Sequence, residues 1–306
     1  MQDITDSEKP VGIKTAVALG LFDGVHIGHR RVLDKAAALA RENGIKPAVF
    51  TFNTASVTSK SSGRIEQLTT DEGKRQRLEE LGFEYIYSPQ FEKLKDMDAE
   101  EFVGEILKKR LNAGYAVCGE NFSFGRGGSA DSKTLCRLCK KYGIETAIES
   151  RLQSGGEVVS STLIRELIKN GGIARANKLL GYNFGFCAKV EHGNEIGRTW
   201  DFPTINQRLP EGLVLPKFGV YCSKAFVDGK WQEAITNIGI KPTVGGLNMP
   251  LAETFIIDYS GDLYGSRIPI ELYEFVRPER VFDSFDGLKA EIARNTEFVK
   301  EYFGIK

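Results

Sequence analysis

The chain has 306 residues, about twice the usual size of one domain, so we expect two domains that each bury a core. Its 41 Lys and Arg residues balance 41 Asp and Glu residues, which leaves no surplus positive field to hold nucleic acid. No apolar run approaches the roughly 18 to 20 residues that span a bilayer, and the polar N-terminus is unlike a signal peptide, so we expect a cytoplasmic protein without a membrane partner.

The first half of the chain alternates strand-like runs with helical periodicity, which predicts an α/β fold with a parallel sheet. The expected strands are 16–22, 47–52, 84–87, 116–119 and 145–148, and the expected helices are 29–43, 72–81, 99–112 and 132–142. The last helix carries Cys136 and Cys139. No second cysteine pair could complete a zinc site, so we interpret both as helix residues.

A glycine-rich segment with two histidines directly follows the first expected strand. It reads Gly20-Leu-Phe22-Asp23-Gly24-Val-His26-Ile-Gly28-His29 and ends where a helix begins. Such a junction presents backbone N–H groups and the positive end of a helix dipole, which favour phosphates. Two of the three histidines of the chain lie here. The alternative is a pair of surface histidines that cap a helix.

Three further segments of this half are candidate ligand sites. Ser160-Ser161-Thr162 precedes a helix that carries Arg165, so hydroxyls and a guanidinium could meet phosphate there; alone, it is an ordinary N-cap. Asn121, Phe122 and Phe124 follow a strand, as do Phe52 and Asn53. Aromatic rings beside amides suit a planar heterocycle, although both phenylalanines of 122–124 could equally belong to the core.

The residue pattern changes after two expected helices, 162–169 and 173–180, from helical periodicity to short strand-like runs. Short strand-like runs at 218–227, 231–238, 253–259 and 268–276 are separated by Gly, Pro, Asn and Asp, which predicts an antiparallel barrel or sandwich. An amphipathic segment, 285–302, should form a closing helix. We therefore predict domains at 1–183 and 184–306.

A second glycine-rich segment lies in the β-rich half. Gly197-Arg198 and Asp201 precede Pro203-Thr204-Ile-Asn206. A hydroxyl and a carboxamide oxygen are hard donors that suit Mg²⁺, and proline would stiffen the loop that presents them. Taken alone, this quartet is an ordinary turn. His192, just upstream, is equally well a phosphate-loop or a turn residue.

Together these motifs resemble, in collinear order, the bifunctional bacterial riboflavin kinase/FAD synthetase family. The His-x-Gly-His segment is similar to the nucleotidyltransferase motif, residues 160–165 to the family's second ATP motif, and residues 203–206 to the riboflavin kinase signature. Further matching strings lie at 218–221, 237–243, 252–254, 262–265 and 277–282. The resemblance implies a Rossmann-like α/β nucleotidyltransferase domain followed by an all-β Greek-key barrel with a terminal helix.

The family's activities imply Mg²⁺ and the substrates ATP, riboflavin and FMN, with FAD as product, and leave homo-oligomerisation open. The resemblance assigns catalytic roles to His26, His29, Ser161, Arg165 and Glu253, the last as kinase base. It assigns ATP binding to Gly20, Phe22, Asp23, Gly24, Gly28, Ser160, Thr162, Gly197, Arg198, Pro203, Thr204 and Asn206, the last two also as metal ligands. It assigns flavin binding to Phe52, Asn53, Asn121, Phe122, Phe124, Arg277 and Glu279.

Two departures and two rival functions follow from the same residues. Asp201 stands where the family has glycine, so a carboxylate would lie near phosphates, and residues 180–184 lack the family's arginine and proline.

One alternative is a single-activity FAD synthetase with an inactive flavin-binding barrel. Another is a flavin-sensing protein, which should lack the catalytic side chains. The balanced charge and the missing lysine-rich signature disfavour an aminoacyl-tRNA synthetase.

Overall fold

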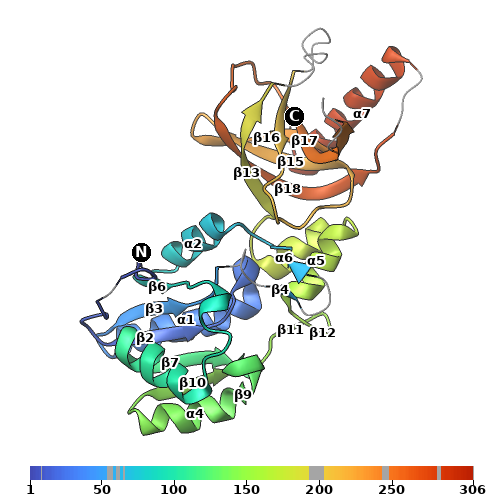
Figure 1. The fold of residues 1–306 in the computed structure, drawn as a ribbon. Helices are drawn as coiled ribbons and strands as arrows, with labels where there is room; N and C mark the ends of the chain where they lie inside the picture. Colours follow the sequence, from blue (N-terminus) through green and yellow to red (C-terminus); the bar gives the residue numbers. More distant parts are fainter. Residues whose placement is uncertain are drawn as a thin grey trace. The chain divides into compact units, whose positions relative to one another are not determined.

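The computed structural model describes residues 1–7, 9–53, 58–59, 63–64, 66–192, 203–242, 248–280 and 284–305. Contacts divide the chain into two compact units, Met1–Ser161 and Thr162–Lys306. None of the helices within the described ranges has the length and apolarity needed to cross a membrane. Figure 1 shows the elements of both units.

The first unit is a three-layer α/β/α sandwich around a parallel sheet. Its strand order is β1-β6-β3-β2-β7-β10, and every pair is parallel. The strands are β1 Gln2–Asp3, β2 Thr15–Leu19, β3 Lys46–Phe50, β6 Tyr85–Tyr87, β7 Ala113–Gly119 and β10 Glu145–Glu149. Because the order reverses direction after β2, a topological switch point lies between β2 and β7, where open α/β sheets bind their ligands.

Alternate residues of the buried strands face opposite layers. Ala18 and Val49 pack with α1 (Ile27–Glu42) and α2 (Asp71–Glu80), whereas Val17 and Phe50 pack with the helices of the other layer. That layer contains α3 Ala99–Glu101, its continuation η4 Phe102–Arg110, a π-helix, and α4 Ser132–Lys141. Cys136 and Cys139 both lie in α4, as predicted; Cys136 is half-buried, whereas Cys139 is fully buried rather than half-buried. The fold class expected for this half is therefore confirmed.

Short elements complete this unit. They are the 3-10 turns η1 Asp23–Val25, η3 Phe91–Lys93 and η5 Arg126–Gly128, and the two-stranded ladders β4 Thr58–Ser59 with β5 Gly63–Arg64, β8 Ser123–Phe124 with β9 Ala130–Asp131, and β11 Gln153–Ser154 with β12 Glu157–Val158.

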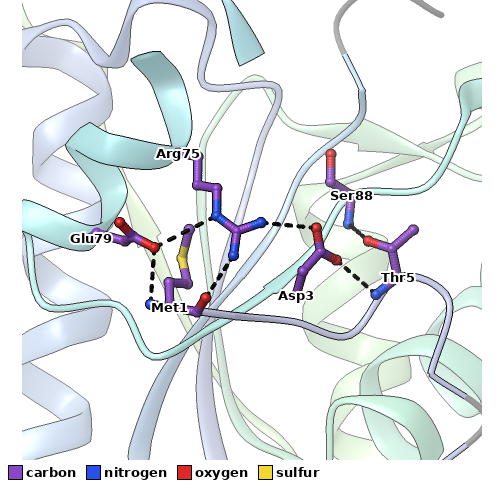
Figure 2. A network of polar contacts seen from close by, with 6 residues as sticks. All are labelled: Met1, Asp3, Thr5, Arg75, Glu79 and Ser88. Atoms are coloured by element: carbon purple, nitrogen blue, oxygen red, sulfur yellow. Dashed lines mark hydrogen bonds and ion pairs between the residues drawn. The ribbon is translucent and has the colours of Figure 1, made fainter. Parts of the chain in front are cut away.

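A polar network ties the first strand to helix α2. Figure 2 shows its members: Met1, Asp3, Thr5, Arg75, Glu79 and Ser88. Arg75 donates to the Met1 carbonyl at 2.7 Å and pairs with Asp3 at 3.2 Å, while the Met1 amino group meets Glu79 at 3.0 Å. Exposed pairs of this kind contribute little individually, but the network fixes α2 beside the sheet edge.

The second unit is a closed antiparallel barrel with the order β13-β14-β17-β16-β15-β18. Three hairpin-connected strands, β15 to β17, are followed by β18, which returns beside β15, so the topology contains a Greek key. The strands are β13 Gly185–Glu191, β14 Thr204–Arg208, β15 Gly219–Val227, β16 Lys230–Pro242, β17 Asn248–Ile256 and β18 Arg267–Arg277. The predicted Greek-key barrel is confirmed.

Helix α7 (Phe285–Phe303) lies against the outside of the barrel. Val299 packs with the outward-facing Val220, Cys222 and Ile235. The barrel interior also holds buried polar groups, since Thr236 hydrogen-bonds to Ser223 and to Thr254, each at 2.8 Å. Because these hydroxyls satisfy one another, they can be buried at low cost.

Two helices precede the barrel, α5 Ser161–Lys169 and α6 Ile173–Leu180, and all of their residues after Ser161 belong to the second unit. The Asn177 amide of α6 donates to the Leu272 carbonyl of β18 at 2.8 Å and accepts from the Phe184 backbone at 2.8 Å. These bonds explain why the compact units divide after Ser161, whereas the sequence places the domain boundary at 183/184.

Candidate active sites

The turn after β2 has an unusual backbone conformation. Phe22 has φ 51°, Gly24 has φ 79° and Val25 has φ 40°. A positive φ is uncommon for a bulky or β-branched residue and often marks a functional site. This turn ends β2 at Leu19, three residues before the predicted end. The buried Asp23 carboxylate accepts from the Leu68 N–H at 2.9 Å and so fixes the turn.

The two histidines of the turn are held together at the start of α1. His26 is the N-cap residue, and its Nδ1 accepts from the His29 backbone N–H at 3.2 Å. The rings stack with centroids 3.6 Å apart, and the Phe22 ring meets His29 edge-on at 5.4 Å. A Cβ at Gly28 would lie 3.1 Å from His26, so the imidazole ring would have to shift slightly to admit a side chain there. The pair is therefore a rigid unit.

His29 has a chemically distinctive environment. Its Nδ1 atom is buried and has no hydrogen-bond partner among the described residues. Burial, together with the charges of His26 and Lys74, holds the pKa of His29 well below its usual value. A neutral imidazole with an unpartnered nitrogen is available to bind or polarise a ligand.

Lys74 is a member of this site that the sequence analysis did not identify. It is 2% exposed, its ammonium donates to the Phe52 carbonyl at 2.9 Å, and it pairs with Asp71 at 3.3 Å. Burial lowers the pKa of Lys74, while Asp71 and Asp23 counter that shift. In the sequence, the burial of Lys74 is indicated only by its spacing: it lies four residues before Leu78, on the same face of α2.

The serine segment contacts the same turn within the first unit. The Ser161 hydroxyl donates to the Asp23 carbonyl at 3.0 Å. Thus Ser161, predicted from its motif, lies directly beside the histidine turn. Ser160 is half-buried, and Thr162 and Arg165 follow in α5, which belongs to the second unit.

The aromatic residues expected on the flavin side follow the carboxyl ends of β3 and β7, and their rings pack with the same hydrophobic core. Phe122 and Phe124 stack at 5.6 Å, and Phe124 also meets Phe102 at 5.3 Å in the core. Phe52 contacts Phe50 edge-on at 5.2 Å. Asn121 is exposed and Asn53 half-buried. The segment that carries Phe122 follows β7 and the histidine turn follows β2, so both lie at the switch point.

In the barrel, two predicted residues stand opposite each other on neighbouring strands, and a third lies nearby on the same strand. Thr204 and Asn206 lie on strand β14, not in the loop that the sequence analysis expected, because β14 pairs with β17 from Thr204 to Arg208. Asn206 stands directly opposite Glu253. Side chains in directly opposite positions point to the same face, with Cβ atoms about 4.5–5.5 Å apart. Pro203 precedes the strand and is exposed.

Arg277 is the last residue of β18, and Glu279 lies two residues after it. The Arg277 Nε pairs with Glu291 of α7 at 2.8 Å, a contact in which Glu291 is buried and Arg277 half-buried. Glu279 accepts from the Asn237 amide at 3.3 Å. The structure therefore gives Arg277 a contact to α7 and places Glu279 over β16. Gly197, Arg198 and Asp201 lie outside the described residues.

The two sites suit different chemistry. The first combines a helix N-terminus, two imidazoles and a buried ammonium, all of which favour anionic phosphates. The second places the Glu253 carboxylate directly opposite the Asn206 carboxamide, an arrangement that can accept a proton from a hydroxyl and offer oxygen ligands to a hard cation.

Comparisons with known proteins agree with this division. The FAD synthetase family model matches residues 9–163, and the riboflavin kinase family model matches residues 180–303. The chain is 32% identical to the bifunctional riboflavin kinase/FMN adenylyltransferase of Listeria monocytogenes, covering 95% of this chain and 93% of the relative. It is 33% identical to the protein of the same description from Escherichia coli, covering 94% and 93%.

A solved structure described as a macrolide-efflux protein from Streptococcus pneumoniae has a closely similar fold. Its TM-score is 0.88 at 26% identity, and the match covers 98% of both chains. The architecture of both units therefore recurs in a protein of the same length range.

Proposed function

The chain belongs to the family of bifunctional riboflavin kinase/FMN adenylyltransferases, and we propose that it phosphorylates riboflavin at the barrel and adenylylates FMN at the histidine turn. The observation that carries the proposal is that each matched region contains one polar cluster suited to its reaction. The stacked His26 and His29 lie in the first region, and the Asn206–Glu253 pair lies in the second.

At the histidine turn, an FMN phosphate oxygen attacks the α-phosphorus of ATP, and the bond to the β-phosphate breaks as pyrophosphate leaves. This exchange needs no protein nucleophile. We assign His26 and His29 to stabilisation of the developing charge, with Ser161 and Arg165 on the departing phosphates. The glycines of the turn, Phe22, Asp23, Ser160 and Thr162 are assigned to ATP. Phe52, Asn53, Asn121, Phe122 and Phe124 are assigned to the flavin side.

At the barrel, the ribityl 5′-hydroxyl of riboflavin attacks the γ-phosphorus of ATP, and ADP leaves. We assign Glu253 as the base that accepts the hydroxyl proton. Gly197, Arg198 and Pro203 are assigned to ATP, and Arg277 and Glu279 to the flavin.

Mg²⁺ fits the donor set of the barrel site. Thr204 offers a hydroxyl and Asn206 a carboxamide oxygen beside the Glu253 carboxylate, and hard oxygen donors of this kind suit Mg²⁺. When bound, Mg²⁺ would neutralise charge on the ATP phosphates.

We also propose that the functional boundary lies at 183/184. The riboflavin kinase model begins at residue 180, close to that position. Small-molecule substrates and a balanced net charge favour a cytoplasmic enzyme without nucleic-acid or membrane partners.

One assay tests the proposal. Purified protein is mixed with riboflavin, ATP and Mg²⁺, and FMN and FAD are quantified by chromatography over time. The expected course is FMN first and FAD second. A protein that makes FAD only when FMN is supplied would be the single-activity alternative, and a protein that makes neither would contradict the whole proposal.

A further inference from the structure

Asn237 extends the polar row of the barrel by one strand. It stands directly opposite Glu253 in the β16–β17 ladder, as Asn206 does in the β14–β17 ladder. The neighbouring Thr236 and Thr254 point into the barrel and are fully buried. Because successive side chains alternate between faces, Asn206, Glu253 and Asn237 form one row on the outer face.

The Asn237 amide is held in one orientation. Its Nδ2 donates to Glu279 Oε1 at 3.3 Å. An ionised carboxylate only accepts hydrogen bonds, so the NH₂ end of the amide must face it. Glu279 lies close over Gly239, where a Cβ would stand 2.1 Å from Oε1. The absence of a side chain at 239 therefore makes room for the group that orients Asn237.

The oxygen of the Asn237 amide is an acceptor without a donor among the described residues. Asn237 Oδ1 is buried and has no hydrogen-bond partner among the described residues. Buried acceptors are almost always paired in native proteins, because an unpaired one has lost its water without compensation. An unpaired acceptor beside a catalytic carboxylate points to a ligand donor.

We propose that Asn237 Oδ1 accepts a hydrogen bond from a ribityl hydroxyl of riboflavin next to the one that reacts, and that Glu279 acts as a positioning residue for Asn237. The inference rests on the proposed kinase activity. The reacting hydroxyl must come within hydrogen-bond reach of Glu253. Asn237 is one strand away, about 5 Å between Cβ atoms, and the ribityl chain carries hydroxyls on successive carbons, so a neighbouring hydroxyl meets it.

The test compares riboflavin with analogues that each lack one of the non-reacting ribityl hydroxyls. The ratio of kcat/KM for riboflavin to that for each analogue is measured in the wild type and in Asn237→Leu, which is similar in size but cannot accept. For one analogue we expect a wild-type ratio of about tenfold to a hundredfold, which falls to about one in Asn237→Leu. The control is Glu233→Gln, on the same strand and face but paired with Lys224, which should keep the wild-type ratio.

Glu279→Gln is the second variant, since Glu279 is exposed and its replacement should not disturb folding. A glutamine can accept or donate, so it no longer fixes the Asn237 amide, and the ratio should fall. An unchanged ratio in Asn237→Leu, or in Glu279→Gln if the first variant does not fold, overturns the proposal. Wild-type protein without riboflavin phosphorylation would instead overturn the proposed function.

Discussion

The imidazole rings of His26 and His29 stack with centroids 3.6 Å apart and an interplanar angle of 14°. Two rings in this arrangement cannot both carry a proton without like-charge repulsion. The Lys74 ammonium is a further positive charge that acts on His29. A site that concentrates cationic and potentially cationic groups in this way favours an anionic ligand, and the same charges, together with burial, lower the pKa of His29.

The first prediction concerns the protonation of His29. Its lowered pKa means that, below the ordinary value of 6.5, the unfolded chain binds this proton more readily than the folded protein. The free energy of unfolding should therefore fall as the pH falls from about 6.5 toward the folded-state pKa. NMR of histidine-labelled protein should show one imidazole that stays neutral well below pH 6.5 and whose signal is absent from His29→Gln. A His29 signal that titrates near 6.5 would contradict this prediction.

Replacing both histidines should separate the two activities. The double variant His26→Ala/His29→Ala removes the donors assigned to the developing phosphate charge, so FAD formation from FMN and ATP should drop by at least about a hundredfold. FMN formation from riboflavin should remain. The control is His192→Ala, which removes the histidine that stacks on Tyr264 in the barrel unit and should leave adenylylation unchanged. Near-normal FAD synthesis in the double variant would remove the assignment.

Gly28→Ala should uncouple stability from activity. Alanine is favoured over glycine inside a helix by up to about 1 kcal/mol, so the melting temperature should hold or rise. The new Cβ would nevertheless lie 3.1 Å from His26, whose ring is confined by His29. Because small displacements of a catalytic group are costly, FAD synthesis should fall about tenfold or more. Gly12→Ala meets nothing within 4 Å and is the matched control.

The fold could be predicted largely from periodicity, because most elements carry clear local patterns. Strands such as β2 are continuous apolar runs, and α6 was predicted at the observed bounds, 173–180. Strands β13 and β14 were missed. β14 contains Asn206, Gln207 and Arg208, whose polarity conceals a strand; Gln207 is nevertheless fully buried, because its amide donates to the carbonyls of Ala188 and Ile268.

The candidate sites could be predicted only where motifs are contiguous in sequence. The histidine turn is one short segment, so it was found. Lys74 reaches that turn from α2, and Asn237 reaches Glu253 through the ladder of β16 and β17. Neither contact follows from spacing along the chain, because each depends on tertiary packing or strand register.

Glu253→Gln should abolish riboflavin phosphorylation. The amide has the shape of the carboxylate but cannot accept the proton of the ribityl hydroxyl, and loss of a general base typically costs about 10²- to 10⁴-fold in rate. FAD synthesis from supplied FMN should continue at the wild-type rate. Glu233→Gln, a charge-neutralising change on the neighbouring strand, controls for the loss of one carboxylate. A Glu253→Gln protein that still phosphorylates riboflavin normally would refute the role of the base.

Lys74→Met should affect both the stability and the chemistry of the first unit. Methionine fills a similar volume but leaves the Phe52 carbonyl without the donor that now lies 2.9 Å away. An unsatisfied buried acceptor costs about 1–3 kcal/mol, so urea unfolding of this unit should shift accordingly. The variant also removes a charge that lowers the pKa of His29, so the His29 signal should titrate at a higher pH than in the wild type, and FAD synthesis should decline.

Arg75→Ala alters the next residue of the same helix, which belongs to the surface network of Figure 2, and should change stability by no more than about 1 kcal/mol. A loss of packing alone would leave the titration of His29 unchanged. If His29 therefore titrates at the same pH in Lys74→Met and in Arg75→Ala, the charge of Lys74 does not act on the histidine pair.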